Sequence, residues 1–352
     1  MVVADSENFR VLIYDAPFTT GASASVVLGQ PDFSTRNEPN IPTASQFGYP
    51  VDVAVDGSGD IWVADSMGSR VVEFKPPFTN GMVPSLVISG GYPSALAFDR
   101  KGNLWVADVG NVAEFTPPFT SGMQASVVIG AYTSCDPGPY HLYIPPSASA
   151  NTFCGPSGIA FDATGDLWVS DFYDLRVLEF VPPFTTGMNA SLELGQPAAT
   201  AFTSNSSQPL SATSLCGAEG LAWDSSGNLW VADAICNRVL EYAPPFSNGM
   251  AASLVLGQPD FTHGANELPL PPPEPNTLTG PSNLWFDRNG DLMISDGGTH
   301  SRVVIFTPPF STGMDASAVI GQPNMTTVGD TCEGSSGTAG NSLCFPDGGV
   351  TY

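Results

Sequence analysis

The chain has 352 residues, with 10 Lys or Arg against 34 Asp or Glu, and its formal net charge is −24. A surface of this charge repels phosphate, which excludes nucleic-acid binding and attraction to anionic membranes as functions. No apolar stretch approaches the eighteen residues that a membrane span needs, so membrane insertion is not expected either.

The sequence repeats one unit six times. In the copy that begins at Cys154, four short apolar runs cover residues 158–162, 166–171, 176–180 and 190–195. Val, Ile, Leu, Phe and Trp dominate the runs and Gly, Pro, Asp or Asn bound them, which is typical of β-strands. An Asp closes the second run of every copy, at spacings of 60, 43, 63, 62 and 63 residues: Asp5, Asp65, Asp108, Asp171, Asp233 and Asp296.

The two ends of the chain complete each other. The first copy lacks its first run and starts at residues 2–5, whereas residues 345–352 read as a first run without a partner. Four antiparallel strands repeated six times predict an all-β, six-bladed β-propeller, a single domain over residues 1–352. The C-terminal strand then joins the N-terminal blade, and the closed ring hides strand edges that promote aggregation.

Two short elements recur between the runs. Residues 162–166 and their counterparts carry Asp-x-x-Gly followed by Asp or Asn, which predicts a tight hairpin with Gly at positive φ. These turns are too short for a calcium loop and lack its distal Glu. The element PPF-[ST]-x-G-M, as in residues 182–188, recurs after the third run. We expect its Phe and Met to pack under each blade; a ring of contact patches for self-assembly is the alternative.

The segment GPSGIAFDATGDLWVSDFYDLRVLEF, residues 155–180, resembles the NHL repeat. The usual pattern joins P-x-G-[IV]-A-x-D, G-x-[IL]-[YW]-V-[AS]-D and N-x-R-[VI]-x-x-[FY]. All six copies match in part, although the third is two residues short after Asp108 and has no Arg. The resemblance implies a propeller. NHL propellers include ligand-binding, protein-binding and RNA-binding domains and a few lyases, and related propellers include metal-dependent lactonases, so the fold does not choose the function.

An Arg follows the repeated Asp by five residues in four copies and by six in another. Because the pair recurs, we expect a structural strut, in which the Asp anchors the turn after the second strand and the Arg bridges to a neighbour. The pairs are Asp5/Arg10, Asp65/Arg70, Asp171/Arg176, Asp233/Arg238 and Asp296/Arg302.

The six cysteines lie outside the apolar runs. Their positions favour sequential pairing, as Cys135/Cys154, Cys216/Cys236 and Cys332/Cys344, among the fifteen connectivities that six cysteines allow. Disulfide bonds form in oxidising compartments, so we expect a secreted, extracellular or periplasmic protein.

Variable loops favour a binding role. The connections from the fourth strand to the next blade differ strongly in length and share one face with the turns after each second strand. Loops of this kind on a rigid scaffold commonly build binding sites. The sequence therefore favours a binding scaffold over an enzyme, with a protein, peptide or carbohydrate ligand. The candidate contact residues are Tyr140, His141, Tyr143, His263 and His300.

Polar residues that do not recur stand at the start of the first runs, beside the expected channel: Asp52, Glu219, Asn283 and Asp347. Such oxygen ligands suit one divalent cation such as calcium. Residues 219–224, EGLAWD, are also similar to the E-G-P-x-W-D element of lactonase propellers, in which the Glu is a metal ligand, but the Pro is missing. A metal-dependent hydrolase or lyase is therefore the alternative function, with no catalytic residue singled out. A structural subunit of an extracellular assembly is a third.

Overall fold

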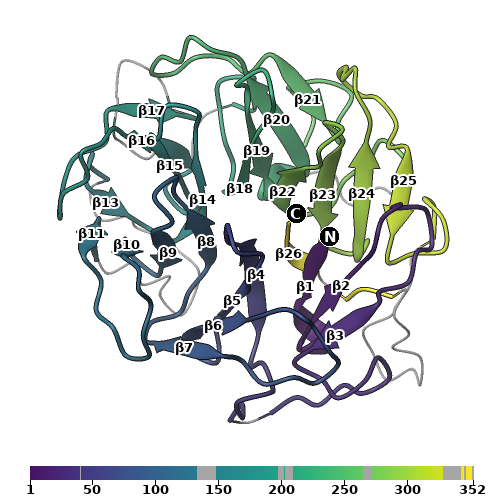
Figure 1. Cartoon of the computed structure of the whole chain (residues 1–352). Helices are drawn as coiled ribbons and strands as arrows, with labels where there is room; N and C mark the ends of the chain where they lie inside the picture. Colours follow the sequence, from purple (N-terminus) through teal and green to yellow (C-terminus); the bar gives the residue numbers. More distant parts are fainter. Residues whose placement is uncertain are drawn as a thin grey trace, which may run out of the picture.

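The computed structural model describes residues 1–39, 41–132, 148–196, 202, 209–264, 272–327, 342–344 and 346–350. These residues form six four-stranded antiparallel sheets around a central opening (Figure 1). Each inner strand packs beside the inner strands of the two neighbouring blades, so the ring is continuous. The prediction of a six-bladed propeller is confirmed. No helix in the described part of the chain is long and apolar enough to cross a membrane.

The blades, from the inner to the outer strand, have the following bounds. Blade 1 contains β26 (Pro346–Val350), β1 (Val2–Asp5), β2 (Arg10–Ile13) and β3 (Val26–Leu28); blade 2 contains β4 (Pro50–Val55), β5 (Ile61–Asp65), β6 (Arg70–Phe74) and β7 (Leu86–Ser89); blade 3 contains β8 (Ala95–Phe98), β9 (Leu104–Asp108), β10 (Asn111–Phe115) and β11 (Val127–Ile129). Blade 4 contains β14 (Pro156–Phe161), β15 (Leu167–Asp171), β16 (Arg176–Phe180) and β17 (Leu192–Leu194); blade 5 contains β18 (Ala218–Trp223), β19 (Leu229–Asp233), β20 (Arg238–Tyr242) and β21 (Leu254–Leu256); blade 6 contains β22 (Pro281–Phe286), β23 (Leu292–Asp296), β24 (Arg302–Phe306) and β25 (Ala318–Ile320).

Four short elements of the described chain lie outside this scheme. A parallel pair, β12 (Ala131–Tyr132) and β13 (Thr152–Phe153), precedes blade 4, and two 3-10 turns, η1 (Ser6–Asn8) and η3 (Ala234–Cys236), follow β1 and β19. Blade 1 closes the ring as predicted, because β26 pairs antiparallel with β1 and places Val350 opposite Val2. The chain ends therefore lie side by side (Figure 1).

The tight turns between inner and second strands are also confirmed. In blade 2, Gly59 adopts φ +82° and donates its N–H to the carbonyl of Asp56, 3.0 Å away. The Asp56 carboxylate accepts the N–H groups of Ser58 and Asp60. The Asp recurs because its side chain holds the turn by hydrogen bonds. The Gly recurs because it tolerates the left-handed backbone that the turn requires.

Aromatic side chains join neighbouring blades. Trp62 on β5 is fully buried and packs edge-on against Phe98 and Phe119 of blade 3, with ring centroids 5.7 and 4.9 Å apart. Phe119 belongs to the PPF element, so the prediction that this Phe packs under the blade is confirmed. Each such ring pair adds about 0.5–1.5 kcal/mol beyond area burial. Equivalent pairs are Trp105–Phe184, Trp168–Phe246 and Trp230–Phe310.

The PPF element also caps the outer edge of the preceding blade. The side chain of Asn80 accepts the N–H of Val27 at 3.0 Å, and Gly81 donates to the carbonyl of the same Val at 3.1 Å. We call this pair of hydrogen bonds the edge staple. It satisfies backbone N–H and C=O groups of the outer strand that could otherwise pair with a strand of another molecule. It recurs from Thr20/Gly21 to Val319, from Thr186/Gly187 to Val128, from Asn248/Gly249 to Glu193 and from Thr312/Gly313 to Val255. Among the described residues, neither Ser121 nor Gly122 makes the corresponding bond to β7, so the joint between blades 2 and 3 lacks the staple.

The Asp–Arg strut exists, and its Asp holds a second segment that was not expected. Nε of Arg70 lies 2.8 Å from Oδ2 of Asp65, and both side chains are largely buried. Oδ1 of Asp65 accepts the N–H groups of Gly48 and Tyr49, where the chain enters the inner strand, so the strut also anchors the connection between blades. The predicted anchoring of the turn after the second strand is seen in blade 1, where Nδ2 of Asn8 donates to Asp5 at 3.0 Å. In blade 3, which has no Arg, Asp108 accepts the N–H of Tyr92 alone from the connection between blades.

One predicted disulfide bond lies wholly within the described residues. Cys216 and Cys236 are bonded, which ties the connection before blade 5 to the turn η3. Cys154 and Cys344 are disulfide-bonded as well. Their predicted partners, Cys135 and Cys332, lie outside the described residues.

Candidate functional site

The inner strands carry β-bulges where the non-repeated polar residues stand. The register with the second strand shifts between Pro50 and Asp52 in blade 2 and between Ala218 and Leu221 in blade 5, and blades 1, 4 and 6 shift likewise. A bulge breaks the alternation of side chains and re-aims them. In blade 5 the bulge also explains Gly220, because a Cβ there would lie 2.6 Å from the Cα of Asn283 in the next blade.

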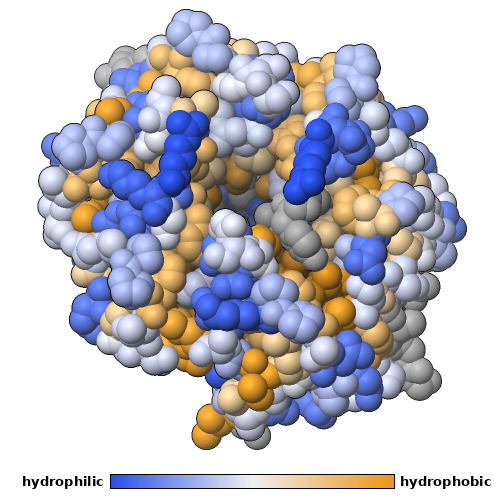
Figure 2. Space-filling model, viewed as in Figure 1, coloured by the Kyte–Doolittle hydropathy of each residue, from blue (hydrophilic) through white to orange (hydrophobic). Residues whose placement is uncertain are grey.

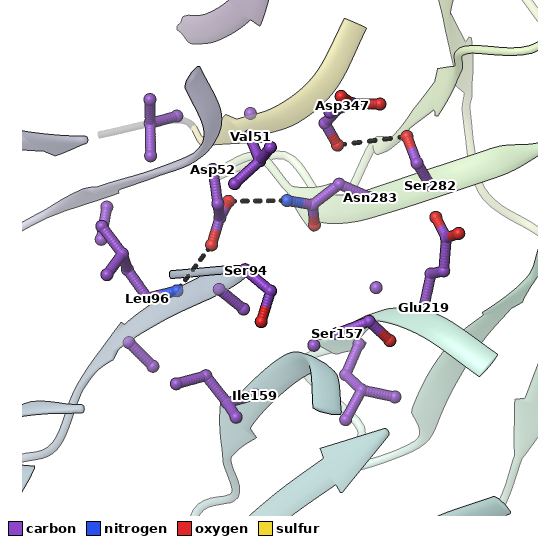
Figure 3. A pocket seen from close by; sticks show the side chains of 18 of the residues that line it. Val51, Asp52, Ser94, Leu96, Ser157, Ile159, Glu219, Ser282, Asn283 and Asp347 are labelled. Atoms are coloured by element: carbon purple, nitrogen blue, oxygen red, sulfur yellow. Dashed lines mark hydrogen bonds between the residues drawn. The ribbon is translucent and has the colours of Figure 1, made fainter. Parts of the chain in front are cut away.

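The bulged residues surround a cavity of about 480 Å³ at the mouth of the channel, which we call the channel cavity. Figure 3 shows polar side chains from all six blades around it. The four predicted metal ligands all line it, although they come from blades 1, 2, 5 and 6. In the part of the chain that the structure describes, no Lys, Arg or His lines this cavity. Its polar lining consists of Asp52, Ser66, Ser94, Ser157, Glu219, Ser282, Asn283 and Asp347.

Two of the four predicted ligands satisfy each other. Oδ1 of Asp52 accepts a hydrogen bond from Nδ2 of Asn283 at 2.8 Å, and Oδ2 accepts the N–H of Leu96 at 2.7 Å. Asp52 therefore links blade 2 to blades 3 and 6. Burial raises the pKa of Asp52 to about 7, against the opposing effect of these hydrogen bonds. Both carboxylate oxygens of Asp52 therefore accept hydrogen bonds from other blades.

Serine hydroxyls join adjacent inner strands. Ser94, Ser157 and Ser282 each donate to a backbone carbonyl of the next blade, at 2.6, 2.9 and 3.2 Å. At the equivalent position of blade 1 stands Asp347, near the hydroxyl groups of Ser6 and Tyr49, which donate to the carbonyl of Pro50 at 2.6 Å and to Oε1 of Glu7 at 3.4 Å. Burial raises the pKa of Asp347 to about 7. The three serines are thus tied into the wall of the channel.

Glu219 is the exception. It takes the place that a serine holds in blades 3, 4 and 6, and no described residue donates a hydrogen bond to its carboxyl group (Figure 3). Burial first, and then the charge of Asp347, raise the pKa of Glu219 to about 8. Its remaining access to solvent is through the hollows it lines. Glu219 is half-buried, and an unpartnered carboxyl with a raised pKa in a cavity wall indicates a candidate site.

The three carboxyl groups of the predicted metal-ligand set do not crowd together. A calcium ion takes its oxygens at about 2.3–2.6 Å, so its ligand atoms must crowd together. Among the described residues, Asp52, Glu219 and Asp347 do not form a group with ligand atoms within 4.8 Å of one another. Two other groups do. The first is Asp56, Asp60 and Glu73, of which Asp60 and Glu73 form ion pairs with Lys75 at 3.3 Å. The second is Cys216, Asp233 and Cys236, in which the two cysteines are disulfide-bonded and Asp233 pairs with Arg238.

A second hollow, of about 420 Å³, opens beside the channel cavity and is called the aromatic groove here. Its apolar wall comprises Tyr92, Val109, Phe172 and Tyr173, and it shares Glu219 with the channel cavity. Tyr92 is 59% exposed and Tyr173 is 47% exposed. Figure 2 shows the hollow centre of the ring from the side of Figure 1, with apolar surface beside it.

Sequence reasoning missed the aromatic groove, although a signal was present. Two residues after the strand-closing Asp, three blades carry a large exposed apolar side chain, Met67, Tyr173 or Ile235, where blade 1 has Glu7. In these four blades the turns after the second strand therefore vary in chemistry while keeping their length, and this variation marks the face.

Of the loop residues predicted to contact a ligand, His263 and His300 lie among the described residues and differ in exposure. His263 is exposed, with Nδ1 2.8 Å from Oδ1 of Asp260. His300 is buried instead, and its Nδ1 lies 2.8 Å from Oδ2 of Asp296, so it is part of the strut of blade 6 and not a surface contact. Tyr140, His141 and Tyr143 lie outside the described residues.

Comparison with known proteins agrees with this architecture. The family model of the NHL repeat matches residues 47–74 and 153–180, the first three strands of blades 2 and 4. The protein is an NHL-repeat β-propeller. No curated protein matches this chain by sequence.

Among solved structures, a chain of a nidogen/laminin complex is 16% identical with TM-score 0.53, and 90% of this propeller and 92% of that chain are covered. A protein of unknown function from Bacteroides caccae is 12% identical with TM-score 0.52, over 90% and 96%. Virginiamycin B lyase from Staphylococcus aureus, with quinupristin, is 12% identical with TM-score 0.43, over 73% of this propeller and 66% of the lyase chain. The first two likenesses show the fold alone.

Proposed function

We propose that this NHL propeller is a binding module of an extracellular or periplasmic space, which holds a protein, peptide or carbohydrate ligand on the face that carries the channel mouth. The observation that carries the proposal is the continuity of the aromatic groove with the channel cavity at Glu219. An apolar strip that opens onto polar groups is the usual composition of a ligand site. The disulfide bonds support the compartment.

Rigidity supports binding at this place. The ring of Phe172 packs edge-on against Tyr173 with centroids 5.0 Å apart, and Gly155 lies under the Tyr173 ring. The nearby Ile235 stands in the turn that the Cys216–Cys236 bond fixes. Tyrosines held in this way offer a large contact area at low entropic cost.

Peptide and glycan arrays test the proposal. Wild-type protein is compared with the double variant Tyr92→Ser/Tyr173→Ser, which shortens the groove wall. The matched control is Val83→Ser/Val181→Ser, two exposed apolar residues in the connections of the opposite face. We expect array ligands that the wild type and control retain and that the groove variant loses. Equal binding by all three proteins would contradict the proposed site.

A hydrolase or lyase is the second candidate, favoured by one observation. A carboxyl group with a pKa near 8, as burial gives Glu219, can exchange protons at neutral pH. Turnover of lactones by the wild type and its loss in Glu219→Gln would support this candidate. Turnover that survives the substitution would remove Glu219 from the chemistry.

A further inference from the structure

We propose that Glu219 receives a basic side chain, Lys or Arg, from an extended peptide whose neighbouring apolar residues lie in the aromatic groove. The inference rests on the proposed binding function and adds the chemical class of the ligand. It depends on three features of the described residues: the charge of the channel cavity, the unpaired state of one carboxyl group, and the place of that group between two hollows.

The charge of the channel cavity favours a cation. Asp52, Glu219 and Asp347 line it, and no basic residue of the described chain does. The whole protein carries a net charge of −24, so its field attracts basic ligands from a distance. An acidic ligand would add a further like charge to this cavity and would be rejected.

The three carboxyl groups of the channel cavity differ in their surroundings. Asp52 already has the N–H of Leu96 and the amide of Asn283, and Asp347 lies beside the hydroxyl groups of Ser6 and Tyr49, away from the aromatic groove. Glu219 has no donor among the described residues. An ammonium or guanidinium group would supply donors and opposite charge at once, which makes this the strongest class of hydrogen bond available to the site.

The position of Glu219 sets the shape of the ligand. It lines both the channel cavity and the aromatic groove, together with Ser94 and Ser157. A long basic side chain can therefore reach Glu219 while its backbone lies along Tyr92 and Tyr173. The exposed faces of these rings accept apolar side chains and can also attract the cation. A free metal ion would leave the groove unused, so a peptide accounts for more of the surface.

The test uses the intact protein and a defined set of N-acetylated, C-amidated peptides, Phe-Leu-X-Leu-Phe, in which X is Lys, Arg, norleucine or Glu. Isothermal titration calorimetry measures their affinities. Norleucine keeps the length of Lys without its charge. The protein variant is Glu219→Gln, which keeps the shape of the side chain. The matched control is Glu38→Gln, the same change at an exposed position in the connection before blade 2.

We expect the Lys or Arg peptide to bind at least about tenfold more tightly than the norleucine peptide, since removal of one partner of a buried charge pair is costly. Glu219→Gln should abolish this preference and Glu38→Gln should keep it. If all four peptides bind with equal affinity and the Tyr92→Ser/Tyr173→Ser variant binds none of them, the aromatic groove is the binding site and the inference about a basic side chain is wrong. If the preference for Lys persists in Glu219→Gln, Glu219 is not the receptor. If no peptide binds, the peptide inference fails, and the arrays above decide the binding function separately.

Discussion

Asn283 donates its side-chain amide to Asp52 across the mouth of the channel, at 2.8 Å. The two residues belong to blades 6 and 2, which are not neighbours because blade 1 lies between them. A single hydrogen bond therefore spans the blade in which the two ends of the chain meet.

The first prediction concerns this bridge. Asp52→Ala leaves the amide of Asn283 and the N–H of Leu96 without an acceptor, which should lower the free energy of unfolding by about 1–3 kcal/mol. Urea denaturation followed by tryptophan fluorescence measures the change. Asp315→Ala, at an exposed position, serves as the control and should have little effect. Equal midpoints for the two variants would show that the bridge adds nothing.

The second prediction concerns pH and stability. Burial raises the pKa of Asp52 and Asp347 to about 7 and that of Glu219 to about 8, above the ordinary values of 3.8 and 4.5. The folded protein thus binds protons that the unfolded chain has released, so this contribution to stability is full below about pH 4 and is lost as the pH rises towards 8. We expect the Tm to fall between pH 5 and pH 9, and to fall less in Glu219→Gln. A Tm profile identical in the two proteins would contradict the raised pKa of Glu219.

The third prediction concerns pH and ligand binding. The ion pair needs the charged form of Glu219, whose pKa lies near 8, while a Lys side chain keeps its charge over this range. Affinity for the Lys peptide should therefore increase from pH 6 to pH 9, and binding should release protons. Asp52 and Asp347 face the same cavity and titrate nearby, so the Glu219→Gln protein supplies the baseline. Affinity that does not change with pH in the wild type would count against the ion pair.

The fourth prediction concerns the missing edge staple. Asn at position 121 can accept the N–H of Val87 as Asn80 accepts that of Val27, so Ser121→Asn should stabilise the protein by about 0.5–1.5 kcal/mol. Ser121→Ala should leave the stability near that of the wild type. Hydrogen exchange provides a second measurement: the amide of Val87 should exchange faster than that of Val27. Protection of both amides to the same degree would mean that β7 is capped in another way.

The fifth prediction concerns metal removal. Since the carboxyl groups of the channel cavity do not form a coordination sphere in the described structure, treatment with a chelator should leave the Tm unchanged. Mass spectrometry of the purified protein gives the independent check. One equivalent of calcium that disappears in Glu219→Gln would restore the predicted metal site.

The repeated Asp revealed the number of blades, and residues 345–352 revealed how the ring closes, because both features follow from strand periodicity and local turn chemistry. The convergence of Asp52, Glu219, Asn283 and Asp347 was also predictable, since equivalent positions of a ring face one channel. The sequence could not distinguish their roles. Whether a carboxyl is paired depends on neighbours 44 or 231 residues away, as for Asp52 with Leu96 and Asn283.

The error over His300 has a similar physical origin. Blade 6 has one extra residue between Asp296 and Arg302, and the lengthened turn folds the imidazole inward to the Asp instead of outward to solvent. Turn length alone does not reveal that direction. The aromatic groove was missed because its wall joins Tyr92 of one connection to Phe172 and Tyr173 of another blade, a contact that only the closed ring creates.

The joint between blades 2 and 3 is packed through Trp62, Phe98 and Phe119, but among the described residues it lacks the hydrogen bonds of the edge staple at its rim. On the channel side Asp52 holds the N–H of Leu96, whereas at the rim no described bond from the PPF element reaches β7. A joint of this kind behaves as a hinge whose pin lies at the axis, so the softest motion of the ring should be a wedge-like opening at its circumference. Tyr92 lies in the connection that crosses this joint, so such an opening would move one wall of the aromatic groove while the acidic mouth keeps its shape.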